Sequence, residues 1–369
     1  MFQTEFAQQA IRNAKAFLGE KTIVLGHSLG AGLLLDLAAT EQFSTIVLLS
    51  PPPLSISEIH ADRVLIATGE IDIPRIRTFV PIATDIGGPN VESWILPWGA
   101  HSAAIFNPAY VRRVVEWLGG EGGKTRTGAR ILWIVVMFLA AVGLGVALMP
   151  DKGTRGQTPR PPIATSQILV RYILAGGVTL LVLKFLDPFK WLRFFATDYL
   201  ISFVFVTGLI LIVLATGTRG LTPRPRGVLM AFAAAGFVIV VPGLFVTSHV
   251  LHMTLSAVRW WRFPFIVLAG IPLFVADELT IRKIRSRLQS IAVALITRGL
   301  FLAFLLTGVL VFNREDAFLV LIAPLIAIFW IALWFATDVV HRHTQDPTAA
   351  ALFAAIVQGW AFAAWFVTI

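Results

Sequence analysis

TIVLGHSLGAG, residues 22–32, starts as an apolar run and then breaks at Gly26-His-Ser-Leu-Gly30 into a helical pattern. A G-x-S-x-G sequence between a strand and a helix predicts a sharp turn that lifts its serine above a sheet. We expect Ser28 in a strained backbone conformation, with no room for a side chain at Gly26 or Gly30. Its hydroxyl would act as a nucleophile, and the N–H of Leu29 at the start of the helix would face an oxyanion.

The composition indicates a membrane protein with a smaller soluble part. Of the 369 residues, 57% are hydrophobic and 14% are charged, and the mean hydropathy is +0.79. The net charge of +9 is spread over short loops between apolar stretches, which favours lipid headgroups over nucleic acid as partners. Because the chain has no cysteine, disulfides and thiolate metal sites are excluded.

Residues 1–120 have the pattern of an α/β domain with a parallel sheet. Short apolar segments, which predict buried strands, alternate with helical or loop segments. The expected helices are 4–18, 29–40 and 108–118, and the expected strands are 22–25, 45–49, 64–67 and 91–96.

Two further residues lie in loops at the carboxyl ends of predicted strands, where open α/β sheets build their sites. Asp72 ends the turn Gly69-Glu-Ile-Asp72, and His101 ends Gly99-Ala-His101. The order Ser28, Asp72, His101 predicts a triad of nucleophile, orienting acid and general base.

These three motifs resemble those of the α/β-hydrolase family, of the esterase and lipase type. The resemblance covers residues 1–120, about a third of the chain, and implies the second half of that fold and no cofactor. Glu70 and Asp85 remain alternatives to Asp72 as the acid. We expect His27 to support the site or the fold rather than to act as a catalyst, because alternate positions around the elbow point away from the site. We expect His60 to be solvated.

One departure from the resembled family concerns the start of the sheet. That family has several strands before the elbow strand, and one of them leads into the loop that provides a second oxyanion donor. Here about 20 residues precede the elbow strand, which predicts an uncovered sheet edge. Three explanations are open: the chain is a fragment, which we favour, a partner chain completes the sheet, or the domain is a decayed remnant.

The remainder of the chain predicts an all-α transmembrane bundle. Residues 121–130 form a glycine-rich, basic linker, and residues 131–369 contain apolar stretches close to the roughly 20 residues that a bilayer requires. Eight spans are expected, the fifth of them short: 131–149, 167–186, 196–215, 227–247, 263–277, 290–312, 317–337 and 348–368.

An internal repeat indicates duplicated two-helix hairpins. GTRGQTPRP at 153–161 recurs as GTRGLTPRP at 217–225, and KWLRF at 190–194 resembles RWWRF at 259–263. The tryptophans of the second pair are expected to anchor at the membrane interface. Orientation stays open, because the positive-inside rule favours the repeat loops inside and the hydrolase domain outside, whereas the lack of a signal peptide favours the reverse.

Polar residues within the predicted spans are candidate sites or structural pairs. These are Arg298, Gln358, Asp198 and Asp338, for which we favour ion pairing or snorkelling. Asp338, His341 and His343 do not predict a metal site, since the two histidines cannot share one helical face and no third strong ligand follows.

The sequence therefore predicts a multi-pass protein of the cell (inner) membrane that carries a serine hydrolase domain. Its expected partners are the bilayer and a small apolar or acyl substrate, and it would cleave an ester or thioester. The alternative is a transporter-like or scaffold membrane protein with an inactive hydrolase remnant.

Overall fold

The computed structural model describes residues 4–19, 22–53, 58–99, 101, 107–121, 129, 136, 140, 143, 163–194, 197–215, 225–245, 255, 257–284, 286–313, 316 and 318–365. The chain divides into two compact units, Met1–Leu132 and Trp133–Ile369. The predicted span at 131–149 and the repeated GTRG segments lie almost wholly outside the described residues.

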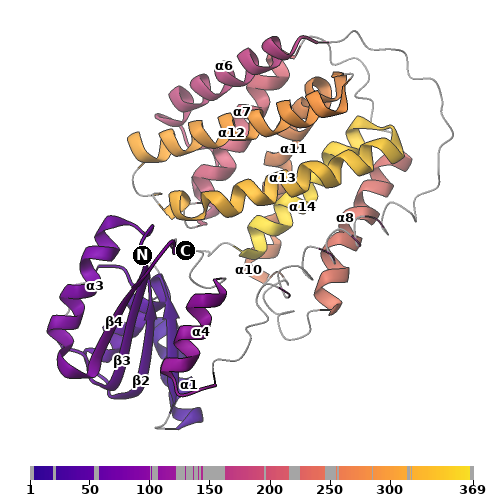
Figure 1. Ribbon diagram of the computed structural model, residues 1–369. Helices are drawn as coiled ribbons and strands as arrows, with labels where there is room; N and C mark the ends of the chain where they lie inside the picture. The colour runs from indigo at the N-terminus through magenta and orange to yellow at the C-terminus, as the bar shows by residue number, and fades with distance from the viewer. Residues whose placement is uncertain are drawn as a thin grey trace. The chain divides into compact units, whose positions relative to one another are not determined.

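The first unit is built on a parallel sheet (Figure 1). Its strands lie in the order β1-β2-β3-β4, with the bounds Ile23–His27, Phe43–Leu49, Ala61–Gly69 and Val91–Leu96. The predicted parallel sheet is confirmed, and three of its strands are longer than predicted. β1 lies at one edge, where Ile23 and Leu25 are about half exposed.

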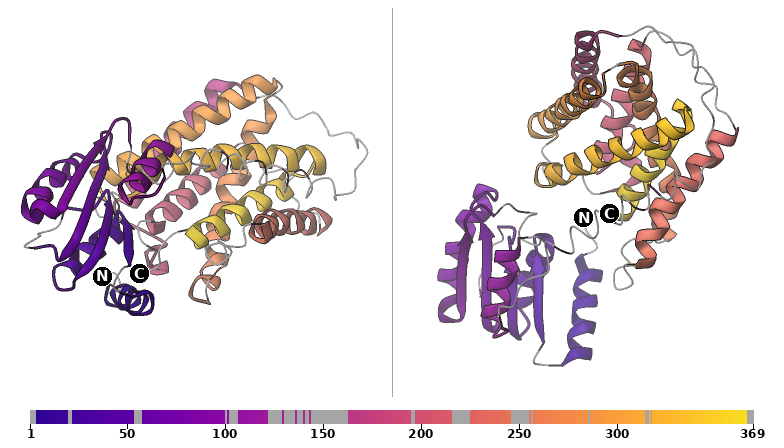
Figure 2. Two further views of the ribbon diagram at one scale, coloured as in Figure 1. Left: turned by 60° about the horizontal axis from the view of Figure 1, so that its bottom comes forward. Right: turned by 45° about the vertical axis from the view of Figure 1, so that its right-hand side comes forward.

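Helices cover both faces of this sheet because its central strands are apolar on both sides. In β2, Ile46 and Leu48 pack with α2 (Leu29–Ala38) and α3 (Pro74–Gly87), while Val47 and Leu49 pack with α4 (Pro108–Trp117). Figure 2 shows these layers in two further views.

One further helix of this unit was predicted from the sequence and another was missed. α1 (Thr4–Leu18) has its predicted bounds and contacts α2. α3 was not predicted, although Pro74 at its first position is a start signal, because Pro81 interrupts its pattern.

The second unit is helical, and its described helices include six that are long and apolar enough to cross a membrane. The chain is therefore a multi-pass membrane protein by the length and composition of its helices. The six spans are Thr165–Leu183 (α6), Thr197–Leu214 (α7), Ala257–Lys283 (α10, Ala257–Trp260; α11, Phe263–Thr280; η5, Ile281–Lys283), Arg287–Val311 (α12), Phe318–Thr344 (α13) and Pro347–Ala364 (within α14, Pro347–Trp365).

The prediction of eight spans is not confirmed. The span at 227–247 corresponds to α8 (Pro225–Phe245), which is counted only as a shorter apolar helix, Pro225–Val240. The span at 263–277 was predicted too short, because α10 and η5 extend its apolar helix to 27 residues.

α11 is the central helix of this bundle and packs along α7 and α14. The two aromatic segments of the repeat meet beside it. Trp191 stacks on Trp261 with ring centroids 6.0 Å apart, and the Arg262 guanidinium lies over the buried ring of Phe194.

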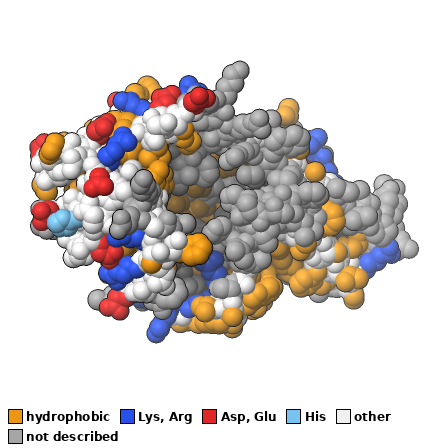
Figure 3. All heavy atoms as spheres, turned by 90° about the horizontal axis from the view of Figure 1, so that it is seen from below, with side chains coloured by type: hydrophobic (Ala, Val, Ile, Leu, Met, Phe, Trp, Pro, Cys, Tyr) orange, Lys and Arg blue, Asp and Glu red, His pale blue; other side chains and the backbone are white. Residues whose placement is uncertain are grey.

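The surfaces of the two units differ on the face seen in Figure 3. The sheet-containing unit carries interspersed acidic and basic side chains, whereas the described helices show mainly hydrophobic side chains. Apolar residues on the helical unit that are more than half exposed include Leu181, Val213, Leu229, Leu268 and Ile328. Exposed apolar side chains on long helices are typical of a lipid-facing surface.

Candidate active site

The turn between β1 and α2 places Ser28 in a strained conformation. Its φ of 53° and ψ of −121° are unusual for a residue with a side chain, as expected for a serine at such a turn. Its N–H donates to the carbonyl of Leu49 at 2.8 Å, which ties the turn to the end of β2.

The two glycines of the turn differ. A Cβ at Gly26 would lie 2.7 Å from backbone atoms of Gly30 and Ala31, so only glycine fits there. The expectation of crowding at Gly30 was wrong, because a Cβ at Gly30 would meet no atom within 4 Å. Gly30 lies in α2, next to the strand that forms the edge of the sheet.

The structure brings Ser28, Asp72 and His101 into one hydrogen-bonded chain. The Nε2 atom of His101 lies 2.8 Å from Ser28 Oγ. The Nδ1 atom of His101 lies 2.9 Å from Asp72 Oδ1 and 3.1 Å from Asp72 Oδ2. Asp72 and His101 are buried, whereas Ser28 is partly exposed, so Ser28 is the member of the hydrogen-bonded chain that a ligand can reach.

Close contact between two loops holds Asp72 and His101 together. A Cβ at Gly69 would lie 1.9 Å from the carbonyl oxygen of Gly99, and the N–H of Ile71 donates to that oxygen at 2.9 Å. The N–H of Glu70 donates to the carbonyl of Leu96 at 2.9 Å. The loops that follow β3 and β4 are therefore tied together by backbone hydrogen bonds, and both glycines are required for their approach.

Hydrogen bonds keep the Asp72 carboxylate ionised. Burial by itself raises the pKa of Asp72, but hydrogen bonds from His101, Ser50 and Thr68 bring its pKa below the usual value. The Thr68 hydroxyl donates to Oδ2 at 2.8 Å, and the N–H of Ile73 donates to Oδ1 at 2.7 Å. An ionised carboxylate at this position accepts a hydrogen bond from His101 Nδ1 and so orients the imidazole.

Thr68 and Ser50 are site residues that the sequence did not reveal. Thr68 had a usable signal, since it directly precedes the Gly-x-x-Asp turn. Ser50 follows β2 directly and has a φ of 48°, and its Oγ lies 3.5 Å from the Thr68 hydroxyl.

His27 does not point away from the site, contrary to the prediction. Its Nε2 lies 2.9 Å from the carbonyl oxygen of His101, and the two imidazole rings lie 5.1 Å apart. Burial lowers the pKa of His27 and so favours its neutral form. Its contacts position the backbone of the His101 loop.

The alternative acids have other surroundings. Glu70 is exposed and its Oε2 accepts a hydrogen bond from the N–H of Trp98 at 3.3 Å, so it braces the histidine loop. Asp85 is exposed on α3. His60, predicted to be solvated, is 40% exposed, with its Nε2 3.6 Å from Glu58 Oε2.

Leu29 is the first residue of α2, where a backbone N–H has no acceptor within its own helix. This N–H is free to stabilise negative charge at the helix N-terminus. Among the described residues 4–19, which precede β1, the structure has the helix α1 and no strand.

Four exposed apolar residues lie close in sequence to the three residues of the hydrogen-bonded chain. Leu29, Ile71, Ile73 and Trp98 are each next to Ser28 or Asp72 or on the histidine loop, and they are 36% to 81% exposed. Trp98 is the most exposed of them and has a φ of 56°. An exposed set of this kind is typical of a surface that binds apolar partners.

The polar residues predicted within spans have partners in the helical unit. Arg298 pairs with Asp277, and Gln358 accepts a hydrogen bond from the Trp330 indole at 2.8 Å. Asp198 accepts from the N–H of Phe194 at 2.9 Å. In the described part of the chain, no group of three or more His, Asp or Glu side chains is arranged to hold a metal ion.

The chain has no significant match among protein-family models, curated proteins or solved structures.

Proposed function

We propose that this protein is a membrane-anchored serine hydrolase that cleaves an ester or thioester of an apolar, acyl-bearing substrate. The observation that carries the proposal is the hydrogen-bonded chain from Asp72 through His101 to Ser28. This arrangement is recognised by its geometry and by the roles of its members. The strained backbone of Ser28 at a strand-to-helix turn adds to its support.

In the acylation step, Ser28 Oγ attacks the substrate carbonyl while His101 Nε2 takes its proton. The N–H of Leu29 stabilises the oxyanion of the tetrahedral intermediate. When the intermediate collapses, the bond to the leaving alcohol or thiol breaks and the leaving group takes the proton from Nε2.

Deacylation repeats these steps with water. Water loses a proton to His101 Nε2 and attacks the acyl carbonyl, and Ser28 Oγ leaves and recovers the proton. The carboxylic acid is then released. Asp72 stays ionised throughout and holds the imidazole in one tautomer.

The residues around Ser28 favour an apolar substrate. Leu29 next to Ser28, Ile71 and Ile73 next to Asp72, and Trp98 on the histidine loop leave apolar surface exposed. Burying that surface against an acyl chain would stabilise the complex by roughly 25 cal/mol for each Å² removed from water. A membrane-spanning chain gives such a domain access to lipid-soluble esters, and we place it in the cell (inner) membrane.

A second candidate function is a transporter-like or scaffold protein whose hydrolase unit is inactive. One observation favours it: the helical unit carries a buried network of charged side chains.

Labelling with a fluorophosphonate, which reacts with activated serines, distinguishes these functions. We expect the detergent-purified chain to be labelled, Ser28→Ala to abolish labelling, and His101→Ala to slow it by about 10²–10⁴-fold. Ser44→Ala is a matched control. The hydroxyl of Ser44, a serine of β2, donates a hydrogen bond to the carbonyl of Thr22 instead of to a residue of the site, so this substitution should leave labelling unchanged.

The labelling outcomes are decisive for the first proposal. No labelling of the folded wild-type chain, or labelling that persists in Ser28→Ala, would overturn the hydrolase assignment. Unlabelled protein from the same preparation would then be supplied with acyl esters and thioesters of graded chain length, and turnover should rise with chain length.

A further inference from the structure

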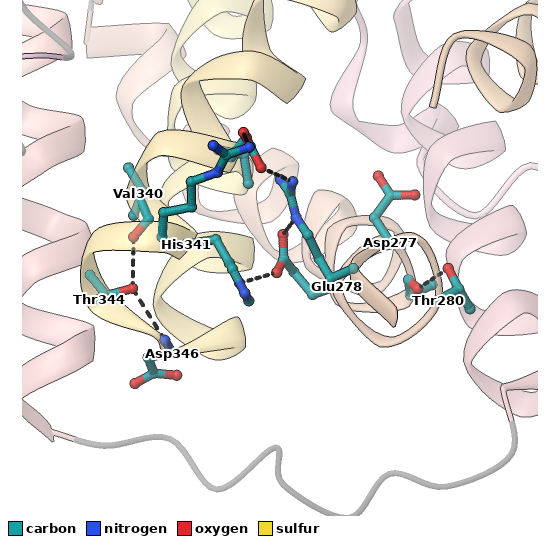
Figure 4. Close-up of polar contacts among 12 residues, drawn as sticks. Asp277, Glu278, Thr280, Val340, His341, Thr344 and Asp346 are labelled. Atoms are coloured by element: carbon teal, nitrogen blue, oxygen red, sulfur yellow. Dashed lines mark hydrogen bonds and ion pairs between the residues drawn. The ribbon is translucent and has the colours of Figure 1, made fainter. Parts of the chain in front are cut away.

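A cluster of charged side chains joins α11 to α13 at one end of the helical unit (Figure 4). The Nε atom of Arg282 lies 3.1 Å from Glu278 Oε1, and the Nδ1 atom of His341 lies 2.6 Å from Glu278 Oε2. Asp338 pairs with both Arg282 and Arg342. Figure 4 shows Glu278 directed toward His341, while Asp277 lies on another side of α11.

A pocket of about 300 Å³ lies beside this cluster. It is lined by Arg287 of α12 and by Asp338, Val339, Arg342 and His343 of α13. Its one carboxylate, that of Asp338, already pairs with two arginines. The lining therefore presents a net positive charge even with His343 neutral, and this charge favours an anion over a cation.

Helix lengths place the pocket at the level of lipid headgroups. Arg287 is the first residue of α12, and the other lining residues belong to the last two turns of α13. These helices of 25 and 27 residues are roughly 37 and 40 Å long, which exceeds a hydrocarbon core of roughly 30 Å. The terminal turns of both helices therefore reach beyond the hydrocarbon.

One donor of the cluster needs an acceptor. The Nη2 atom of Arg282 is buried and has no hydrogen-bond partner within the part of the chain that the structure describes. Buried guanidinium donors are normally satisfied. Arg282 pairs with Asp338, which lines the pocket, so this unsatisfied donor belongs to a side chain in direct contact with the pocket lining.

We propose that this pocket binds a phosphate group, and that the side chains of Arg287 and Arg342 hold it. The planar guanidinium group matches phosphate oxygens with two parallel hydrogen bonds, which gives arginine an advantage over lysine at such a site. At the headgroup level, the nearest source of this chemistry is an anionic phospholipid, and basic pockets between membrane helices bind such headgroups. This site is independent of Ser28 and of the proposed hydrolase activity.

The test measures lipid binding to the detergent-purified full chain by native mass spectrometry. Dioleoyl phosphatidylglycerol and the zwitterionic dioleoyl phosphatidylcholine are titrated separately, and inorganic phosphate is added as a competitor. The variants are Arg287→Gln, Arg342→Gln and Arg287→Lys. The matched control is Arg226→Gln, an exposed arginine in the first turn of α8, a helix whose Gly227 packs against Asp346 at this same end of the bundle.

We expect the chain to prefer phosphatidylglycerol, and Arg287→Gln and Arg342→Gln each to weaken its binding about five-fold. Arg287→Lys should recover part of the loss, and Arg226→Gln should change binding less than two-fold. Competition by inorganic phosphate at millimolar concentration would support the same site with a soluble ligand as its source.

Two results would overturn the proposal. Equal weakening by Arg226→Gln and by Arg287→Gln would reduce the effect to general surface charge, and unchanged binding in both pocket variants would exclude the site. Arg342 also pairs with Asp338, so its substitution could disturb folding. Arg287 keeps the test valid, because it stands at the exposed start of α12 and lies outside the charged cluster.

Discussion

At the residue scale, the turn that carries Ser28 requires glycine at position 26. Replacing Gly26 can be compared with replacing Gly30, the second glycine of the same turn. At Gly26, an added Cβ would lie 2.7 Å from the backbone of Gly30 and Ala31. We expect Gly26→Ala to cost about 1–3 kcal/mol of stability, because the backbone has to shift, and to displace Ser28 from His101. Thermal unfolding and the rate of fluorophosphonate labelling measure the two effects.

Gly30→Ala serves as the control for that prediction. Gly30 lies in α2 with open space around its Cα, and alanine favours a helix over glycine by about 0.5–1 kcal/mol. The substitution should therefore be neutral or stabilising. If it destabilised the protein as much as Gly26→Ala, the space beside Gly30 would have to be filled in the folded protein, for example by a strand pairing with β1.

At the element scale, an ion pair holds α11 against α12. Asp277 pairs with Arg298 of α12 and accepts a hydrogen bond from Tyr172 of α6, and all three side chains are buried. A charge that loses its partner in such an environment is costly, so we expect Arg298→Met to destabilise the helical unit by about 3–5 kcal/mol.

Replacing Tyr172, Asp277 and Arg298 together should cost less stability than replacing Arg298 alone. In a Tyr172→Phe, Asp277→Leu, Arg298→Met variant, no charge is left unpaired, and most of the lost stability should return. Thermal unfolding in detergent of the single and triple variants measures this. A triple variant that is less stable than Arg298→Met would show that the pair contributes net stability rather than specificity.

The same scale explains which elements could be predicted. The strands and α1 follow from local apolar periodicity, which is a property of consecutive residues. α3 was missed because Pro81 breaks its pattern, and the structure retains the helix by burying Ile76, Phe79, Val80 and Ala83 against the sheet. Tertiary packing therefore overrides local preference there.

At the scale of the whole molecule, the number and direction of the spans can be tested with single cysteines, because the chain has none of its own. The structure places the loop between η5 and α12 at the same end of the bundle as the loop between α13 and α14, since Arg282 pairs with Asp338. We expect Ser286→Cys and Gln345→Cys to react with an impermeant maleimide from one side of the membrane.

Asn313→Cys, between α12 and α13, should react only from the opposite side. Sealed vesicles and opened vesicles give the comparison. Reaction of all three positions from one side would show that α12 and α13 do not both cross the bilayer. The same data would decide the orientation that the distribution of basic residues leaves open.

The amino-acid sequence was enough to predict the parallel sheet, the membrane character and the order Ser28, Asp72, His101. These follow from local patterns, and the carboxyl ends of parallel strands lie at one edge of a sheet, so residues in those loops are brought near each other. Their grouping could thus be predicted without knowing a single contact.

Three features became clear from the folded chain alone: which acid meets the histidine, where His27 points, and which charges pair in the membrane. Glu70 and Asp72 are two residues apart in sequence. Which of them contacts His101 depends on how the loops at Gly69 and Gly99 pack against each other. Glu278 and His341 are far apart in sequence and meet because α11 and α13 come together at one end of the bundle. Such contacts depend on the packing of whole elements, which no local pattern encodes.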